Sequence, residues 1–165
     1  MSSILTMNKI KITPLFVRHD FRLFDPSSYL SLLIRVIIGF WANHVAIKYE
    51  SEDFAWVVES RSGGVMKVTW ENWLKHRPYK QWVISKELEI EEYKVNIRLG
   101  IAYDVASLFE HLRYRITHNW IGDKSPREEN CSELLADLLD LPDAYSATPK
   151  SLYEYLNNGK IFDNK

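Results

Sequence analysis

Apolar residues recur along the chain with two different periods, and the period changes near residue 43. Before that point they lie three and four residues apart, at Leu30, Leu33, Ile34, Ile37 and Ile38. This spacing predicts a helix with one buried face, which Ser27 or Ser28 can cap and which ends near Gly39. The stretch contains Arg35 and is too short for a membrane span of roughly 20 residues. No membrane span is therefore expected.

A period of two follows, which predicts strands. Val45, Ile47 and Tyr49 share one face of the first strand, and His44, Ala46 and Lys48 share the other. Further strands are expected at 54–59 and 65–68, with a tight turn at Ser62, Gly63 and Gly64 between them, so the three strands form a β-meander. Shorter strands are expected at 10–12, 15–17, 82–84 and 88–90.

The second half of the chain has a helical pattern. A short helix is expected at 70–76 and a longer one at 93–112, interrupted at Gly100 and restarting near Tyr103. A polar loop at 119–129 comes next. Asn130 then caps a helix that runs to about Leu141, and Glu133 completes a capping box. A last helix is expected at 150–157. This order predicts a single α+β domain over residues 1–165, with an antiparallel β-meander or small barrel packed against helices.

Composition limits the classes of function. The formal net charge is -1, so no overall field attracts nucleic acid, and the basic stretch Lys75, His76 and Arg77 is too short to change this expectation. Neither phosphate-binding glycine motif is present. One cysteine and scattered histidines make a metal site improbable, and no cofactor is expected. With a single cysteine, no internal disulfide and no evident secretory signal, we expect a soluble cytoplasmic protein of undetermined oligomeric state.

Cys131 is the first candidate for chemistry. A lone cysteine is usually a small buried apolar residue, but this one falls in the first turn of a predicted helix, directly after a polar loop. Free backbone N–H groups and partial positive charge at a helix N-terminus stabilise a thiolate. The same N–H groups can bind the oxyanion of a tetrahedral intermediate. The position therefore suits a nucleophile.

A nucleophilic thiol needs a base, and His44 is the best candidate among five histidines. It opens a regular strand, which holds an imidazole rigidly, although a half-buried histidine of a sheet explains it as well. His76, His111 and His118 lie among polar or basic neighbours, and His19 is expected in a loop between Arg18 and Asp20. All four are most simply solvated.

Glu59 is the candidate for orienting His44. If the turn between the first two strands of the meander centres between Ser51 and Glu52, then Glu59 lies directly opposite His44. Such cross-strand partners point to the same face, so the carboxylate could accept the imidazole N–H. The alternative is a surface acid at the end of a hairpin, and a shifted turn would change the register.

The arrangement of these residues resembles the permuted papain-like amidases, in particular the YiiX-like branch of the NlpC-type cysteine hydrolases. In this order the histidine strand precedes the cysteine helix, whereas in papain the cysteine comes first. The resemblance covers roughly Ile12 to Leu156 and is carried by Leu33-Ile34-Arg35, Asn43-His44-Val45-Ala46-Ile47, Val57-Val58-Glu59, Gly64-Val65, Tyr103-Asp104, Cys131-Ser132-Glu133-Leu134 and Thr148-Pro149.

The resemblance implies a papain-like fold and roles for individual residues. Cys131 would attack an amide carbonyl, His44 would deprotonate it, and Glu59 would orient His44. Tyr103 resembles a tyrosine that lies near the oxyanion site in related hydrolases, although a buried core tyrosine explains it equally well. The expected activity is cleavage of an amide in a peptide, such as a cell-wall peptide, through an acyl-enzyme on Cys131.

Two alternatives stay open from the sequence. The same fold in enzymes that resemble lecithin:retinol acyltransferase moves acyl groups between lipids or hydrolyses thioesters. A protein of this fold could also bind a partner without turnover, with the tryptophan-rich stretch from Trp70 to Trp82 as its recognition surface. The sequence does not identify the natural substrate.

Overall fold

The computed structural model describes residues 8–19, 26–51, 53–75, 80–104, 106–117 and 128–158. In chain order the elements are β1 (Lys9–His19), α1 (Pro26–Ile38), β2 (His44–Glu50), β3 (Ala55–Arg61), β4 (Gly64–Thr69), α2 (Trp70–Lys75), β5 (Lys80–Ile84), β6 (Leu88–Glu91), α3 (Glu92–Arg98), α4 (Ala106–Thr117), α5 (Cys131–Leu138), the 3-10 helix η1 (Ala144–Ser146) and α6 (Pro149–Asn158). The α+β class and the β2–β3–β4 meander agree with the sequence pattern. The expected helix 70–76 corresponds to α2, although residue 76 lies outside the described residues.

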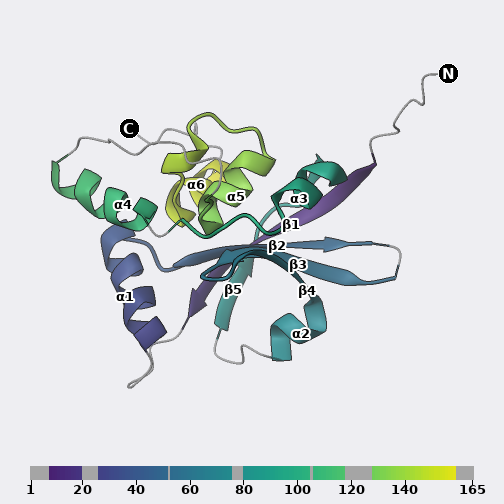
Figure 1. Cartoon of the computed structure of the whole chain (residues 1–165), viewed down its shortest axis with the longest axis horizontal. Helices are drawn as coiled ribbons and strands as arrows, with labels where there is room; N and C mark the ends of the chain where they lie inside the picture. Colours follow the sequence, from purple (N-terminus) through teal and green to yellow (C-terminus); the bar gives the residue numbers. More distant parts are fainter. Residues whose placement is uncertain are drawn as a thin grey trace.

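The strands form one open antiparallel sheet rather than a small barrel. Its strand order is β4-β3-β2-β1-β5, and β6 also pairs with β1. The sheet lies between α5 and α6 on one side and α2 on the other (Figure 1). The late helix that begins at Cys131 therefore packs against strands from the first half of the chain.

The sequence predicted two short strands at 10–12 and 15–17, separated by Pro14, but the structure has one continuous β1 in the middle of the sheet. On one edge β1 pairs with β2, and on the other edge β6 pairs with Lys9–Ile12 and β5 with Leu15–His19. The carbonyl of Pro14 accepts a hydrogen bond from the Ser85 N–H. The N–H and C=O groups of a strand residue point to the same edge of the strand. Pro14 has no N–H, and its edge faces the gap between β5 and β6, where proline is tolerated within a strand.

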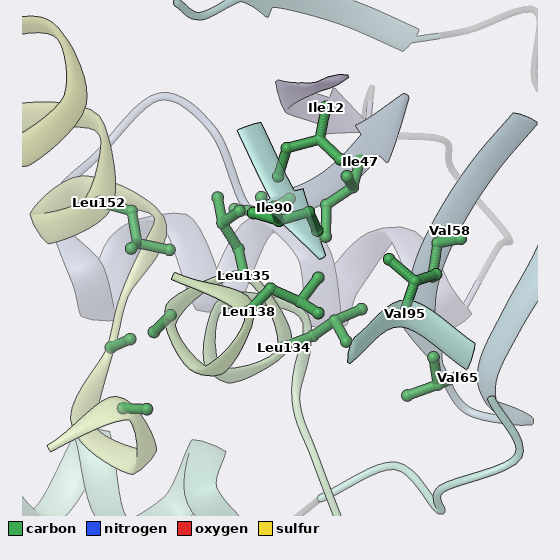
Figure 2. Packing of buried hydrophobic residues seen from close by; sticks show 14 of the residues in the cluster. Ile12, Ile47, Val58, Val65, Ile90, Val95, Leu134, Leu135, Leu138 and Leu152 are labelled. Atoms are coloured by element: carbon green, nitrogen blue, oxygen red, sulfur yellow. The ribbon is translucent and has the colours of Figure 1, made fainter. Parts of the chain in front are cut away.

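The α5 side of the sheet holds the main aliphatic core. Figure 2 shows Leu134, Leu135 and Leu138 of α5 among side chains from the sheet and α6. The residues it labels from β1, β2, β3, β4, β6, α3 and α6 are Ile12, Ile47, Val58, Val65, Ile90, Val95 and Leu152. Leu134, Leu135 and Leu152 are fully buried and Leu138 is nearly so. This packing fixes α5 on the sheet, and with it the position of Cys131.

The opposite side of the sheet carries a tryptophan cluster. Trp73 is buried against Leu15, Val17, Ala46 and Val57. Its ring stacks on Trp70 with centroids 5.2 Å apart, and Trp82 meets it edge-on at 5.7 Å. Trp70, Trp73 and Trp82, whose stretch was considered above as a recognition surface, thus form part of a second core of the fold.

Several helix boundaries differ from the sequence expectation. Helix α1 begins at Pro26, so neither Ser27 nor Ser28 precedes it as a cap. Proline suits a first helical position, where a backbone N–H has no partner within the helix. The predicted buried face of α1 was wrong in part, since Ile37 is buried but Leu30 and Leu33 are exposed. Helix α5 ends at Leu138 rather than Leu141, because Asp140 adopts a left-handed conformation at φ 53°. The predicted interruption at Gly100 is confirmed, and α4 begins at Ala106 rather than near Tyr103. None of the described helices combines the length and apolarity needed to cross a membrane.

Candidate active site

The start of α5 is built by Asn130, and the predicted capping box is confirmed. The Asn130 side chain accepts hydrogen bonds from the backbone N–H groups of Ser132 and Glu133, each at 2.9 Å. The Glu133 carboxylate accepts the Asn130 N–H in return at 3.4 Å. Cys131 is thereby held as the first helical residue, with only 7% of its surface exposed.

The sequence suggested that the free backbone N–H groups at the start of α5 could bind an oxyanion, but the cap leaves fewer of them available. The N–H groups of Ser132 and Glu133 are occupied by Asn130, so they do not face a substrate. The backbone N–H of Cys131 precedes them and takes no part in the cap. An oxyanion would thus rely on this single N–H and on a side-chain donor from another element.

His44 and Glu59 do meet. The His44 Nε2 atom lies 2.8 Å from a Glu59 carboxylate oxygen, and both residues are buried, with Glu59 fully so. Because Nε2 is occupied by the carboxylate, Nδ1 is the ring nitrogen left to face Cys131. This is the arrangement of base and orienting acid that the hairpin argument expected.

The predicted register was nevertheless wrong by two residues. Ile47 lies opposite Val58, and Glu50 lies opposite Ala55. Continued outward, this register sets Glu59 opposite Ala46 and diagonal to His44. Because side chains alternate with a period of two, a shift of two leaves Glu59 on the same face as His44. A shift of one residue would have separated them.

Cys131 and His44 lie close enough to shift each other's pKa. Burial by itself raises the pKa of the Cys131 thiol, but the charge and hydrogen bond of His44, with further hydrogen bonds from the Val45 backbone and Ser132, lower it overall. Burial likewise lowers the pKa of His44, but Cys131 and then Glu59 raise it well above its usual value. Each group favours the charged form of the other, which favours a thiolate–imidazolium pair.

Glu59 stays ionised because its surroundings are cationic. Burial opposes the charge, but His44, the Arg61 guanidinium and the Trp73 indole N–H lower the pKa of Glu59 to about 2. Arg61 Nη1 lies 3.3 Å from the second carboxylate oxygen. Glu59 is therefore a permanent anion at neutral pH, as orienting an imidazolium requires.

Sequence reasoning missed two residues behind His44. His19, expected to lie in a loop and be solvated, is the last residue of β1, and its ring centroid lies 5.4 Å from that of His44. The Asn43 side chain accepts the His19 backbone N–H at 2.9 Å and contacts the His19 ring at 3.2 Å. The pairing of Val17 with His44 brings these residues together. No local pattern signals this contact, since it arises from a long-range strand pairing.

A cleft with an empty volume of about 350 Å³, including space open to solvent, lies over Cys131. Its lining comes from α1, the residues around Tyr103, α4, the start of α5 and the start of α6: Ile34, Ile38, Asn43, Tyr103, His111, Asn130, Cys131, Ser132, Ala147, Thr148 and Pro149. Thr148 caps α6 by accepting the Ser151 N–H at 3.1 Å. Helices distant in sequence thus build the walls of one cleft.

Tyr103 shares this cleft with Cys131. Burial, and then the charges of Cys131 and Asp104, raise the pKa of the Tyr103 hydroxyl far above its usual value. The hydroxyl therefore keeps its proton at any physiological pH. It is a side-chain donor in the same cleft as Cys131.

His111, expected to be solvated, also lines the cleft. Burial lowers its pKa to about 4 despite the nearby Asp104, so the ring is neutral at pH 7. Its position on α4 (Ala106–Thr117), packed beside α1, accounts for the correction. His76 and His118 lie outside the described residues, as does most of the expected loop at 119–129.

Among the described residues, no group of three or more His, Cys, Asp or Glu side chains is arranged to hold a metal ion. Comparison with known proteins found no match. No family model matches the chain, and no curated protein or solved structure is significantly similar to it.

Proposed function

We propose that the protein is a cysteine hydrolase that cleaves an amide bond through an acyl-enzyme on Cys131. The observation that carries this proposal is the buried chain of interactions from Cys131 through His44 to Glu59, at the edge of a cleft. An inert buried cysteine needs neither an adjacent imidazole nor a buried acid behind it. The order of an early histidine strand and a late cysteine helix supports a permuted papain-like fold for this sheet and its helices.

The reaction follows from the three side chains. The Cys131 thiolate attacks the carbonyl carbon, forming a C–S bond and moving an electron pair to the carbonyl oxygen. The Cys131 N–H and the Tyr103 hydroxyl are the donors available to that oxyanion. When the C–N bond breaks, the His44 imidazolium gives its proton to the departing amine. Neutral His44 then takes a proton from water, which attacks the thioester and releases the acid.

Glu59 contributes by holding the His44 ring through Nε2 and by stabilising its positive charge. Because the pair is buried, this electrostatic effect is stronger than it would be in water. The His19 ring, which contacts the Asn43 side chain, lies 5.4 Å from the His44 ring and limits the positions that the imidazole can take. The imidazole is thus positioned before substrate arrives.

A second candidate, acyl transfer to or from a lipid, has one observation in its favour. Helix α1, which provides Ile34 and Ile38 to the cleft, also exposes large apolar side chains, as does α4: Tyr29, Leu30, Leu32, Leu33, Val36, Phe109 and Ile116. An aliphatic chain leaving the cleft would meet apolar surface there. Release of fatty acid from phospholipid vesicles, compared with release of amine from a peptidoglycan fragment, separates the two candidates.

The central test uses the fact that Cys131 is the chain's single cysteine. We expect wild-type protein to react with iodoacetamide at pH 7 faster than free cysteine does, and to gain one acyl group when incubated with p-nitrophenyl acetate. Intact mass spectrometry detects both products. Cys131→Ala should lose both, and turnover of any amide substrate should fall by at least about 10³-fold.

Ser62→Ala, in the exposed turn between β3 and β4, is the matched control and should behave as wild type. A folded wild-type protein whose cysteine reacts no faster than free cysteine, and which never carries an acyl group, would overturn the proposal. That outcome would favour a binding protein without turnover.

A further inference from the structure

A second group of charged side chains, buried in part, lies beside α5, apart from Cys131, His44 and Glu59. Arg98, at the end of α3, contacts Glu129 at 3.1 Å and Asp137 at 3.0 Å. Glu129 is only 1% exposed and precedes the cap residue of α5. We call Arg98, Glu129, Glu133 and Asp137 the Arg98 cluster.

The cluster is connected to the start of the nucleophile helix through the backbone. The Ser60 hydroxyl of β3 donates to the Glu129 carbonyl, and the Glu129 N–H donates to Ala102 at 2.7 Å. Glu133 accepts the N–H of Asn130, the residue that caps Cys131. Movement of Glu129 would therefore move the cap and the sulfur with it.

The charges of the cluster do not balance. Three carboxyl groups face one guanidinium, and Asp104 adds further negative charge near Glu133. One Glu129 oxygen accepts from Arg98, whereas Oε2 is buried without a hydrogen-bond donor among the described residues. Asp137 lies near enough to hydrogen-bond Glu129. Two carboxylates can form that bond only if one of them carries a proton.

We propose that Arg98, Glu129 and Asp137 position Cys131. The carboxyls of Glu129 and Asp137 share one proton, and the loss of that proton at mildly alkaline pH misaligns the Cys131 sulfur. The catalytic part of this inference rests on the proposed function, whereas the proton itself does not. Arg98, Asp137 and Glu133 are the charged groups that act on Glu129, and Asp104 acts on Glu133.

The electrostatics agree with this geometry. Burial, together with Asp137 and Glu133, raises the pKa of Glu129 to about 8 although Arg98 opposes it. Burial also raises the pKa of Glu133 to about 7. A carboxyl whose pKa is higher in the folded than in the unfolded chain binds more protons when folded, so stability falls as pH rises from about 4.3 toward the folded value.

The test is Glu129→Gln, which keeps the shape of the side chain and imitates its protonated form. We expect wild-type melting temperature to fall between pH 5 and pH 8.5, and the variant to fall much less. The second-order rate constant of Cys131 alkylation, measured over the same range, should decline above pH 8 in wild type and not in the variant. Asp137→Asn, which removes the competing carboxylate, should flatten the profiles in the same way.

Asp140→Asn is the matched control: Asp140 follows the same helix, is exposed, and pairs with Lys94, so its profiles should match wild type. Profiles of Glu129→Gln and Asp137→Asn that superimpose on wild type would overturn the inference. A melting profile that changes as expected, in a protein whose Cys131 shows no enhanced reactivity, would support the shared proton and reject the proposed function instead.

Discussion

Two groups of charges, each centred on a buried glutamate, lie beside α5, and they differ in charge balance. In the first group, Glu59 meets His44 and Arg61, and His44 favours the thiolate form of Cys131. In the second group, Glu129, Glu133 and Asp137 share one guanidinium, that of Arg98. The first group has a cation for each anion. The second has an excess of acid.

The comparison shows that burial alone does not decide whether a carboxyl group is protonated. Both Glu59 and Glu129 are almost completely buried, yet the pKa of Glu59 falls to about 2 and that of Glu129 rises to about 8. Desolvation raises both pKa values, so the sign of the result follows from the charges in contact with each carboxyl. A buried acid is ionised where nearby cations balance the anions and protonated where the anions are in excess.

The largest effect should come from removing the charge of Glu59, which is part of the group with balanced charges. Glu59→Gln keeps a hydrogen-bonding group beside His44 but removes the charge that favours the imidazolium. We expect kcat/KM for an amide substrate to fall by about 10²-fold or more at pH 7, and Cys131 alkylation to slow by about tenfold. Stopped-flow alkylation and steady-state assays measure the two effects.

The control for that variant is Glu50→Gln, on the exposed end of β2, where the carboxylate pairs with Lys48. It should leave both rates unchanged. The stability that Glu59 contributes is present above the pKa of an unfolded glutamate, about 4.3, and is lost as pH falls toward about 2. Equal alkylation rates in Glu59→Gln and wild type at pH 7 would contradict the role assigned to Glu59.

Removing the guanidinium of Arg98 from the Arg98 cluster should have a smaller but clear effect. Arg98→Met leaves Glu129 and Asp137 without their guanidinium, and we expect a loss of about 3 kcal/mol in the free energy of unfolding at pH 7. The loss should shrink at pH 5, where Glu129 is protonated and no longer needs a cation. Urea denaturation at both pH values checks this.

Lys94→Met on the same helix is the comparison for Arg98→Met. Lys94 pairs with exposed Asp140, and such surface pairs contribute at most about 1 kcal/mol. A loss in Lys94→Met as large as in Arg98→Met would show that α3 responds to any lost charge, and would remove the distinction between the two ion pairs.

The smallest effect should come from Trp73→Phe. The change keeps a ring in the tryptophan cluster but removes the indole N–H that helps to lower the pKa of Glu59. That pKa should rise by less than about one unit, so the variant should unfold in acid at a slightly higher pH than wild type. Acid titration followed by circular dichroism measures the midpoint, and a lower midpoint would contradict the expected sign.

Local sequence determined much of this protein. The period-two stretch after residue 43 specified the meander, and the three-and-four spacing before it specified α1. The Asn130–Glu133 capping box located the start of α5 to the residue, because a cap is made by neighbours in the chain. Cys131, His44 and Glu59 could be chosen from these patterns, since each stands at a defined place in a local element.

Tertiary structure decided what the local patterns could not encode. The register of β2 against β3, the course of β1 through Pro14, and the contacts of His19 and His111 with the site all depend on pairings between distant segments. The charge balance of the Arg98 cluster does too, because α3 and α5 meet only after folding. A periodic pattern states which face of an element is buried, but the partner of that face is chosen by packing across the whole chain.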